Sequence, residues 1–290
     1  MKIQKTYKNP KPTIYLVGTP IGNLQDMSFR SIEVLTSVDE IYCEDTRTSS
    51  TLLSHYKIKK PLVSFHKFNE ASRLEKIKES LEQGKNIAII SDAGVPVICD
   101  PGAKLLEKLI NDDKFEHFSI TAINAGPAYI HCLIVSGFSG IENNFLGFWD
   151  QKNKNQELVI NNFKKDVAYI FYESVHRIRQ TLLFLSQKLG GESKILIGRE
   201  ITKINEEFVW LSASEIQEYL DTNQLTEKGE FVVVLIPEMG NLKLSISEEE
   251  QIEKVMIEKN NGLNTKSAIS KVSKEFGLNK NKLYELFHKK

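Results

Sequence analysis

The stretch TIYLVGTPIGNL, residues 13–24, decides the fold, because a short apolar segment runs directly into a turn of glycine and proline. Residues 13–18 predict a buried strand and residues 19–24 predict a loop. The same succession recurs in NIAIISDAGVPVICDPG, residues 86–102, where four apolar residues in a row suit a strand buried on both faces. Both segments therefore predict strands of a parallel sheet that is covered by helices.

Working outward, strands, polar loops and helices alternate along the chain. In the first half the predicted strands are 13–18, 41–43, 62–65, 86–91 and 118–123, and the predicted helices lie near 29–38, 71–83, 103–110 and 128–136. This alternation predicts an α/β domain with a mostly parallel sheet. A second α/β pattern has predicted strands at 167–172, 194–198, 206–211 and 230–236, with helices at 175–189 and 213–220.

The chain ends in a different pattern. Residues 265–276 and 280–288 each show helical periodicity, and Gly277, Leu278 and Asn279 form a turn between them, which is typical of a helix-turn-helix. Residues 237–247 resemble a linker. We therefore predict four segments: a basic polar N-terminal arm (1–12), an N-terminal α/β domain (13–140), a second α/β domain (141–240) and a C-terminal helical domain (241–290).

Charge and cysteine content narrow the class of protein. The net charge is zero, but residues 1–12 carry four lysines and no acid, and residues 262–290 carry seven lysines against two glutamates. Basic ends of this kind are typical either of contact with phosphate backbones or of a merely soluble surface. The three cysteines have no metal or disulfide spacing, no apolar run is long enough to span a bilayer, and the N-terminus has no signal core. We expect a cytoplasmic protein without a metal or membrane partner.

Four loops are candidates for chemistry, because ligands of open parallel sheets bind beyond the carboxyl ends of the strands. They are residues 19–24, 44–47, 92–102 and 125–128. Their small residues let a ligand approach the backbone and their prolines fix the turns. Together they predict a cleft that holds a cofactor largely by main-chain groups. The phosphate loop and the dinucleotide fingerprint are both missing from the sequence.

Six blocks in order resemble the ribosomal small-subunit RNA 2′-O-methyltransferase I family, a branch of the tetrapyrrole-methylase superfamily. They are VGTPIGNL (17–24), EDTR (44–47), SDAGVPVICDPG (91–102), FYESVHRI (171–178), GREITK (198–203) and KGEFVVV (228–234). The resemblance implies two α/β domains, with S-adenosylmethionine in the cleft between them, and a homodimer. It also implies that the enzyme methylates the ribose 2′-oxygen of a cytidine in the decoding region of 16S rRNA, either in free rRNA or in the small ribosomal subunit.

The resemblance also carries cofactor positions. The implied cofactor-binding residues are Pro20, Asp92, Ala93, Gly94, Val95, Ala128, Tyr129 and Tyr172. Two departures stand out. The usual Pro-Gly-Pro of the fifth loop is Ala125-Gly126-Pro127 here, and the usual Gly-Phe-Leu-Pro is Gly147-Phe148-Trp149-Asp150, followed by lysines where an arginine is expected.

Methylation of a ribose hydroxyl needs a base or a strong local field, because the hydroxyl is a weak acid. The candidate catalytic residues are Asp45, Glu200 and Lys203, with Glu44 and Glu173 as further acids. Guanidinium groups suit phosphates, so Arg47, Arg177 and Arg199 are candidate RNA-binding residues. Lys271, Lys280 and Lys282 of the C-terminal helices join them as basic candidates. For each charged residue an interdomain salt bridge is the competing interpretation.

Two other functions stay open at this stage. A methylase acting on a small tetrapyrrole would share the cofactor cleft but would need no basic tail. A noncatalytic RNA-binding factor for ribosome assembly would keep the fold without affinity for the cofactor.

Overall fold

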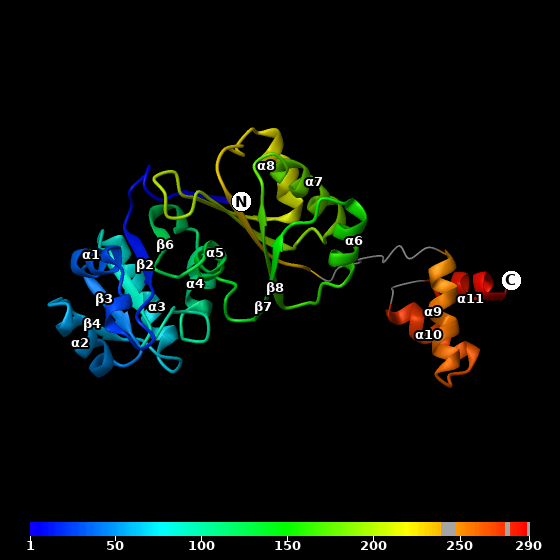
Figure 1. Cartoon of the computed structure of the whole chain (residues 1–290), viewed down its shortest axis with the longest axis horizontal. Helices are drawn as coiled ribbons and strands as arrows, with labels where there is room; N and C mark the ends of the chain where they lie inside the picture. Colours follow the sequence, from blue (N-terminus) through cyan, green and yellow to red (C-terminus); the bar gives the residue numbers. More distant parts are fainter. Residues whose placement is uncertain (239–247, 276–278, 289–290) are drawn as a thin grey trace.

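The structure is a computed structural model that describes residues 1–238, 248–275 and 279–288. Figure 1 shows two α/β units side by side and a separate group of helices at the C-terminal end. Within the described ranges no helix is both long and apolar enough to cross a membrane.

The first unit is built on a fully parallel sheet of five strands, as predicted. Their order is β4-β3-β5-β2-β6, which places β5 at the centre and β2 between β5 and β6. The bounds are β2 (Thr13–Val17), β3 (Glu40–Cys43), β4 (Leu62–Ser64), β5 (Ile87–Ile90) and β6 (Ser119–Ile123). Since all five strands run the same way, the loops that follow them share one edge of the sheet.

Helices cover both faces of this sheet. They are α1 (Phe29–Ser37), α2 (Thr46–His55), α3 (Glu70–Glu82), α4 (Ala103–Ile110) and α5 (Ala128–Ser136), with short 3-10 turns at Leu24–Asp26 and Phe115–His117. Apolar residues of α1 and α2 form one core with the sheet, and those of α3, α4 and α5 form the other. Helix α2 was missed from the sequence, because its apolar positions are few and its signal is the capping residue Asp45.

The second unit holds a six-stranded sheet in the order β1-β10-β9-β11-β8-β7, which is antiparallel except for the β7–β8 pair. The bounds are β1 (Lys2–Lys5), β7 (Glu142–Phe148), β8 (Val167–Glu173), β9 (Lys194–Arg199), β10 (Glu207–Ser212) and β11 (Phe231–Ile236). Its helices are α6 (Asn153–Asn161), α7 (Ile178–Lys188) and α8 (Ile216–Asp221), with a 3-10 turn at Ala213–Glu215. The predicted strands are confirmed. Strand β7 and helix α6 were missed, because they lie in the Asn- and Lys-rich stretch that looked like a break.

The N-terminal residues belong to the folded second unit, so the prediction of a separate basic polar arm over residues 1–12 is corrected here. Lys2–Lys5 pair with β10 as an edge strand. The side chain of Gln4 also bonds to β6 of the first sheet. Its Nε2 donates to the Ile120 carbonyl at 2.8 Å, and its Oε1 accepts from the Ile120 N–H at 2.9 Å. Gln4 thereby satisfies the free edge of β6 and joins the two sheets. The other domain boundaries stay predictions.

The two α/β units share one hydrophobic core, and helix α5 lies between them. Apolar residues from both sheets belong to this core, and α5 contacts β6 of the first sheet and β8, β9 and β11 of the second. Gly198 allows the close approach, because a side chain there would stand 2.8 Å from the Cys132 sulfur on α5. Burial on all sides explains why α5 is apolar almost throughout.

The C-terminal helices α9 (Glu248–Asn260), α10 (Thr265–Glu275) and α11 (Lys280–His288) form a small unit with a core of its own. That core is Val255, Ala268, Ile269, Val272 and Leu283. The predicted helix pair is confirmed, and α9 is an additional helix that packs against both. Of the predicted turn, only Asn279 lies within the described residues, where its side chain caps α11 by accepting from the N–H groups of Asn281 and Lys282. Most of the predicted linker, residues 239–247, lies outside them.

Candidate functional site

The loops after β2 and β6 are bonded to each other where the strands end. The N–H of Gly18 donates to the Ile123 carbonyl at 2.8 Å, and the Asn124 side chain donates to the Gly18 carbonyl at 3.3 Å. A Cβ at Gly18 would stand 2.2 Å from the Asn124 carbonyl oxygen, which excludes every other residue. The glycine of VGTP is therefore required for this contact.

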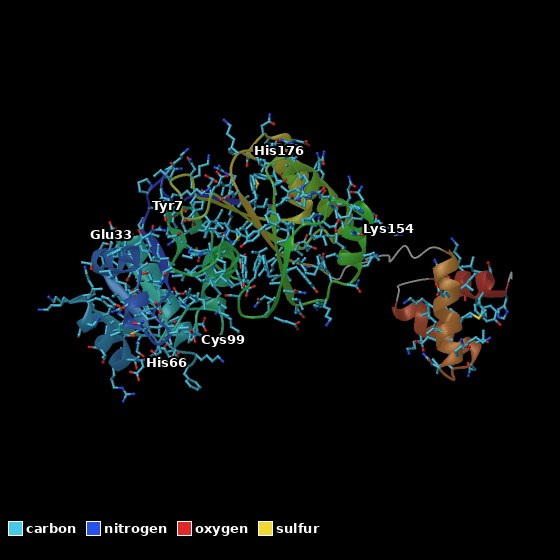
Figure 2. The ribbon with its side chains drawn as sticks, viewed as in Figure 1. Tyr7, Glu33, His66, Cys99, Lys154 and His176 are labelled. Atoms are coloured by element: carbon cyan, nitrogen blue, oxygen red, sulfur yellow. The ribbon has the colours of Figure 1, made fainter. Side chains whose placement is uncertain are left out.

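The loop after β5 joins the same group. The N–H of Thr19 donates to the Gly94 carbonyl at 2.8 Å, and the Ser91 hydroxyl donates to that oxygen at 2.9 Å. Gly94 has a φ of +82° and lies against the Ile21 side chain. The three turns thus converge at one edge of the sheet. Figure 2 shows His66 and Cys99, from the loops after β4 and β5, on the same side of this unit.

The fourth loop, which follows β3, places Asp45 beside the loop after β5. The Asp45 carboxylate caps α2 by accepting from the Arg47 N–H at 2.8 Å, and it forms an ion pair with the Arg47 guanidinium at 2.7 Å. These bonds lower the pKa of Asp45 to about 2. The N–H of Asp45 donates to the Asp92 carboxylate at 3.2 Å, which connects the loops after β3 and β5. Asp92 also helps to raise the pKa of Asp100, although burial is the larger cause.

His131, on the first turn of α5, supports the loop after β6 from below. Its Nε2 faces the Ala125 N–H at 3.3 Å, and its Nδ1 faces the Pro127 carbonyl at 3.3 Å. To accept from the Ala125 N–H, Nε2 must carry no proton, and to donate to the Pro127 carbonyl, Nδ1 must carry one. Both bonds therefore form only in the neutral tautomer that is protonated at Nδ1. Burial lowers the pKa of His131, which favours this neutral form. These two contacts give His131 the role of shaping the loop after β6.

A run of aromatic rings connects α5 with the second sheet. Tyr129 stacks on Phe145 with ring centroids 4.2 Å apart, Phe145 meets the edge of Tyr172 at 5.1 Å, and Tyr172 contacts Phe148 at 5.5 Å. The structure therefore brings Tyr129 and Tyr172 together through a third ring. Phe145 and Phe148 were missed because β7 was missed. The available signal in the sequence was the presence of these two aromatic residues in a segment rich in Asn and Gly.

The residues expected to bind a cofactor are accessible at this edge. Asp92 and Ala93 are exposed, and the other six are half-buried, namely Pro20, Gly94, Val95, Ala128, Tyr129 and Tyr172. Open space lies above two further glycines of the loops, Gly22 and Gly126. Their role in binding stays a prediction.

The candidate catalytic residues form two separate groups. Asp45 lies on the first unit, whereas Glu200 and Lys203 lie in the turn between β9 and β10. The Lys203 ammonium is 2.7 Å from the Glu200 carboxylate and 2.9 Å from that of Glu230. Glu200 also accepts from the Glu230 N–H at 3.1 Å. These contacts lower the pKa of Glu200 and raise that of Lys203.

The acid Glu173 is buried and fully engaged. It accepts from the Thr181 hydroxyl and the Ser174 N–H, both at 2.6 Å, and pairs with Arg177 at 2.7 Å. The structure thereby gives Arg177 an internal partner. Arg199 likewise pairs with Glu207 at 3.4 Å. Both ion pairs lie within the second unit, so the interdomain salt bridge considered as the alternative for these two arginines is wrong.

The remaining basic candidates lie at the surface. The side chain of Arg47 is 90% exposed despite its pair with Asp45. Lys271 pairs with Glu258 at 2.8 Å, and the Lys280 ammonium donates to the Ser270 hydroxyl at 3.1 Å. Lys282 is exposed on α11. Contact of any of them with RNA stays a prediction.

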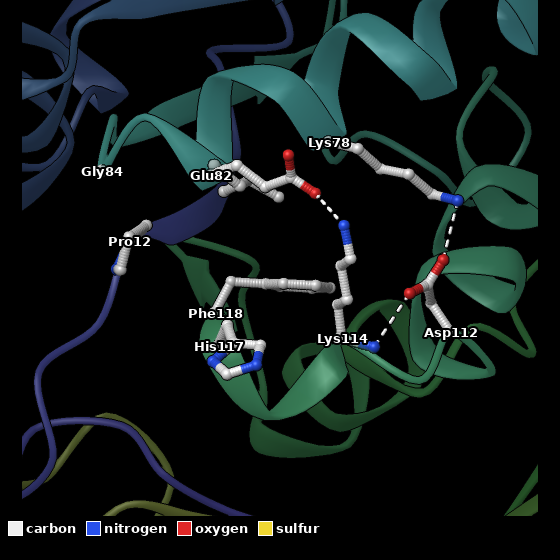
Figure 3. A pocket seen from close by; sticks show the side chains of 9 residues that line it. Pro12, Lys78, Glu82, Gly84, Asp112, Lys114, His117 and Phe118 are labelled. Carbon is white, nitrogen blue, oxygen red and sulfur yellow. Dashed lines mark hydrogen bonds and ion pairs between the residues drawn. The ribbon is translucent and has the colours of Figure 1, made fainter.

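A hollow of about 410 Å³ lies at the opposite edge of the first sheet, where Pro12, Gly84 and Phe118 precede their strands (Figure 3). Its charged residues are paired, with Lys78 on Asp112 at 2.7 Å. The charges of this hollow are therefore neutralised within the protein. In the part of the chain that the structure describes, no group of three or more His, Cys, Asp or Glu residues could hold a metal ion.

A sheet edge with these loops and a second sheet packed beside it define a class of protein. The model of the family described as tetrapyrrole (corrin/porphyrin) methylases matches residues 13–217. The chain is therefore a methyltransferase with the two-unit α/β fold expected from the sequence.

Relatives identify the branch of this class. The ribosomal RNA small subunit methyltransferase I of Bacillus subtilis (strain 168) is 36% identical over 97% of this chain and 96% of its own. The protein of that name from Pasteurella multocida (strain Pm70) is 36% identical over 94% and 95%. That from Mycoplasmopsis pulmonis (strain UAB CTIP) is 39% identical over 76% and 96%. The chain belongs to the ribosomal RNA small subunit methyltransferase I family, as its motifs predicted.

Proposed function

We propose that this enzyme transfers a methyl group from S-adenosylmethionine to a ribose 2′-hydroxyl of a cytidine in the decoding region of 16S rRNA. The names of the relatives support small-subunit rRNA as the substrate. The observation that carries the proposal is the bonding of the loops after β2, β5 and β6 into one group through Gly18, Thr19 and Gly94. This is the edge at which an open parallel sheet binds its ligand.

The residues at this edge fit S-adenosylmethionine. Small residues and open space over Gly22 and Gly126 leave room for a ligand against the main chain. The exposed Asp92 carboxylate can accept hydrogen bonds from hydroxyl groups, and Tyr129 with Tyr172 offers aromatic surface to a base. Bound there, S-adenosylmethionine supplies an activated methyl group.

The protein must then hold the ribose oxygen in line with that methyl group and receive a proton. Asp45, with a pKa of about 2, is a weak base at neutral pH. Glu200 is also held as an anion, because its pKa is lowered by Lys203. We propose that Asp45, Glu200 and Lys203 act through charge and position at the two sides of the site rather than by full proton abstraction.

We propose that RNA is held by the C-terminal helices, with Lys271, Lys280 and Lys282, and by Arg47 at the cofactor edge. We also propose that the enzyme works as a homodimer on rRNA or on the small ribosomal subunit in the cytoplasm, where that substrate occurs. Exposed apolar residues that follow β2, Ile21 and Phe29 at 82% and 94% exposure, support a protein or RNA partner at this rim.

Labelled methyl transfer tests the proposed function. Small ribosomal subunits and free 16S rRNA, both from cells that lack this protein, are incubated with enzyme and methyl-labelled S-adenosylmethionine, alongside a porphyrinoid. We expect label in rRNA as one 2′-O-methylated cytidine in the decoding region. Label in the porphyrinoid alone would favour the tetrapyrrole methylase, and label in neither would contradict the proposal.

A further inference from the structure

A second hollow, of about 240 Å³, lies beyond the last residues of the second sheet. Four basic residues line it: Lys5, Lys8, Arg199 and Lys228. Three of its walls come from distant parts of the chain, namely the turn after β1, the end of β9 and the segment before β11. The fold therefore gathers positive charge here that is dispersed in the sequence.

Arg199 forms the base of this hollow. The residue is 8% exposed. Its Nε donates to the Glu207 carboxylate at 3.4 Å and its Nη1 to the Lys228 carbonyl at 3.3 Å. Over the described residues, its Nη2 makes no hydrogen bond or ion pair. Two bonds already hold this guanidinium in place. Its remaining N–H groups can therefore bind a further acceptor with little additional loss of side-chain entropy.

Four basic residues line the hollow against three acids, Glu200, Glu206 and Glu207. Strand pairing sets Lys5, Glu207 and Arg199 side by side, so one carboxylate faces two cations. Lys8 and Lys228 are exposed, and no ion pair or hydrogen bond engages their ammonium groups within the described ranges.

The other two acids of the hollow are directed elsewhere. Glu206 accepts from the Thr121 hydroxyl at 2.8 Å and from the Thr202 N–H at 2.7 Å. Glu200 is paired with Lys203. The positive charges of Lys8 and Lys228 are therefore not compensated by the acids that line the hollow.

The position relative to the methyl-transfer site is set by strand register. Tyr172 pairs with Val232, which pairs with Gly198, the residue before Arg199. Two strand spacings separate β8 from β9, or about 10 Å. Arg199 points to the opposite face of the sheet from Gly198, and both lie at the same end. A polynucleotide bound at the proposed methyl-transfer site beside Tyr172 can therefore reach the hollow by passing over the end of the second sheet at which Arg199 lies.

We propose that this hollow binds a backbone phosphate of the RNA, a few nucleotides from the methylated ribose, through Arg199, Lys8 and Lys228. The inference rests on the proposed function and adds a substrate contact to it. Phosphate is the shared chemistry of two sources, an RNA backbone and a free phosphate ion, and the experiment separates them.

The test is the salt dependence of 16S rRNA binding to the Lys8→Ala/Lys228→Ala double variant. Neither ammonium group has a contact that the fold needs. We expect binding to weaken roughly three- to tenfold at about 100 mM salt, and the slope of log affinity against log salt to fall in magnitude by about 1, as for the loss of one phosphate contact. The Lys8→Arg/Lys228→Arg variant should restore the slope.

The matched control is Lys164→Ala/Lys165→Ala, which removes two exposed lysines that precede β8 at the opposite end of the same sheet. It should keep the wild-type slope, and both variants should bind S-adenosylmethionine as the wild type does. An unchanged slope in Lys8→Ala/Lys228→Ala overturns the phosphate site while leaving the proposed function intact. So does calorimetric binding of inorganic phosphate that the two substitutions abolish without any change in rRNA affinity. A wild-type enzyme that neither binds nor methylates rRNA overturns both proposals.

Discussion

The N–H of Thr19 donates to the carbonyl oxygen of Gly94 at 2.8 Å, so the loop after β2 is bonded directly to the loop after β5. This bond joins two segments that are 75 residues apart in the sequence. It depends on the backbone of Gly94, which has a φ of +82°. Any residue with a side chain is strained there.

Replacing Gly94 by alanine should therefore weaken cofactor binding. The new methyl group would stand 3.2 Å from Ile21, and the backbone would be strained by about 1 kcal/mol. We expect affinity for S-adenosylmethionine to fall about fivefold or more in calorimetry. Gly84→Ala is the matched control, because Gly84 has a φ of +80° and lies at the opposite edge of the sheet. Equal loss of cofactor affinity in both variants would argue against a local role for Gly94.

The aromatic run predicts a second effect on the cofactor. Phe145→Ala removes the stack on Tyr129 and the edge contact with Tyr172, each worth about 0.5 to 1.5 kcal/mol. We expect about tenfold weaker binding of S-adenosylmethionine. Phe148→Ala, which loses one more distant contact at 5.5 Å, should have a smaller effect. The reverse order of the two effects would contradict the placement of the cofactor beside Tyr129 and Tyr172.

His131 predicts a pH dependence of stability. Burial lowers the pKa of His131 in the folded state, whereas the pKa of a histidine in the unfolded chain is about 6.5. Below that pH the unfolded chain binds a proton that the folded chain does not. The stabilising contribution is therefore complete above about pH 6.5 and is lost as the pH falls toward the lowered pKa. His131→Gln should reduce the difference in Tm between pH 7.5 and 5.5, whereas His176→Gln, at an exposed position, should leave it as in the wild type. An unaltered difference in His131→Gln would exclude the buried neutral imidazole as its source.

The C-terminal helices should matter for RNA and not for the cofactor. Their core, around Val255 and Ile269, is made within the three helices themselves. Deleting residues 245–290 should therefore weaken rRNA binding and leave S-adenosylmethionine affinity unchanged. The relative from Mycoplasmopsis pulmonis aligns over 96% of its own length but 76% of this chain, so a shorter chain exists in the family. If rRNA affinity survived the deletion, the helix pair would have another function.

The fold was predictable where patterns are local. The apolar runs of β2 and β5 and the glycines beside them predicted the sheet and the edge at which its loops converge. Strand β1 was not predictable, because the lysines of Lys2–Lys5 resemble a solvated arm and its pairing partner β10 lies about 200 residues away. Strand β7 was also not predicted. It lies at the edge of its sheet, and its polar residues are exposed there and give no strand pattern in the sequence.

The site was predictable as a set of loops but not as a set of contacts. The motifs predict that Asp92, Gly94 and Tyr172 bind the cofactor, which stays a prediction, whereas the assignment to the family is confirmed. Salt bridges of Arg177 and Arg199 were expected only between the domains, whereas both arginines pair with acids of their own unit, Glu173 and Glu207. The sequence also contained no sign that His131 holds the loop after β6.

The most direct measurement for the central claim is a calorimetric titration of S-adenosylmethionine into the wild-type enzyme and Asp92→Ala. Asp92 is exposed, so its loss should leave the fold intact, and Asp113→Ala, at another exposed aspartate, is the control. The account predicts binding to wild type and Asp113→Ala, and loss of binding in a folded Asp92→Ala protein. Undiminished affinity in Asp92→Ala would contradict a cofactor site formed by the loops that follow β2, β5 and β6.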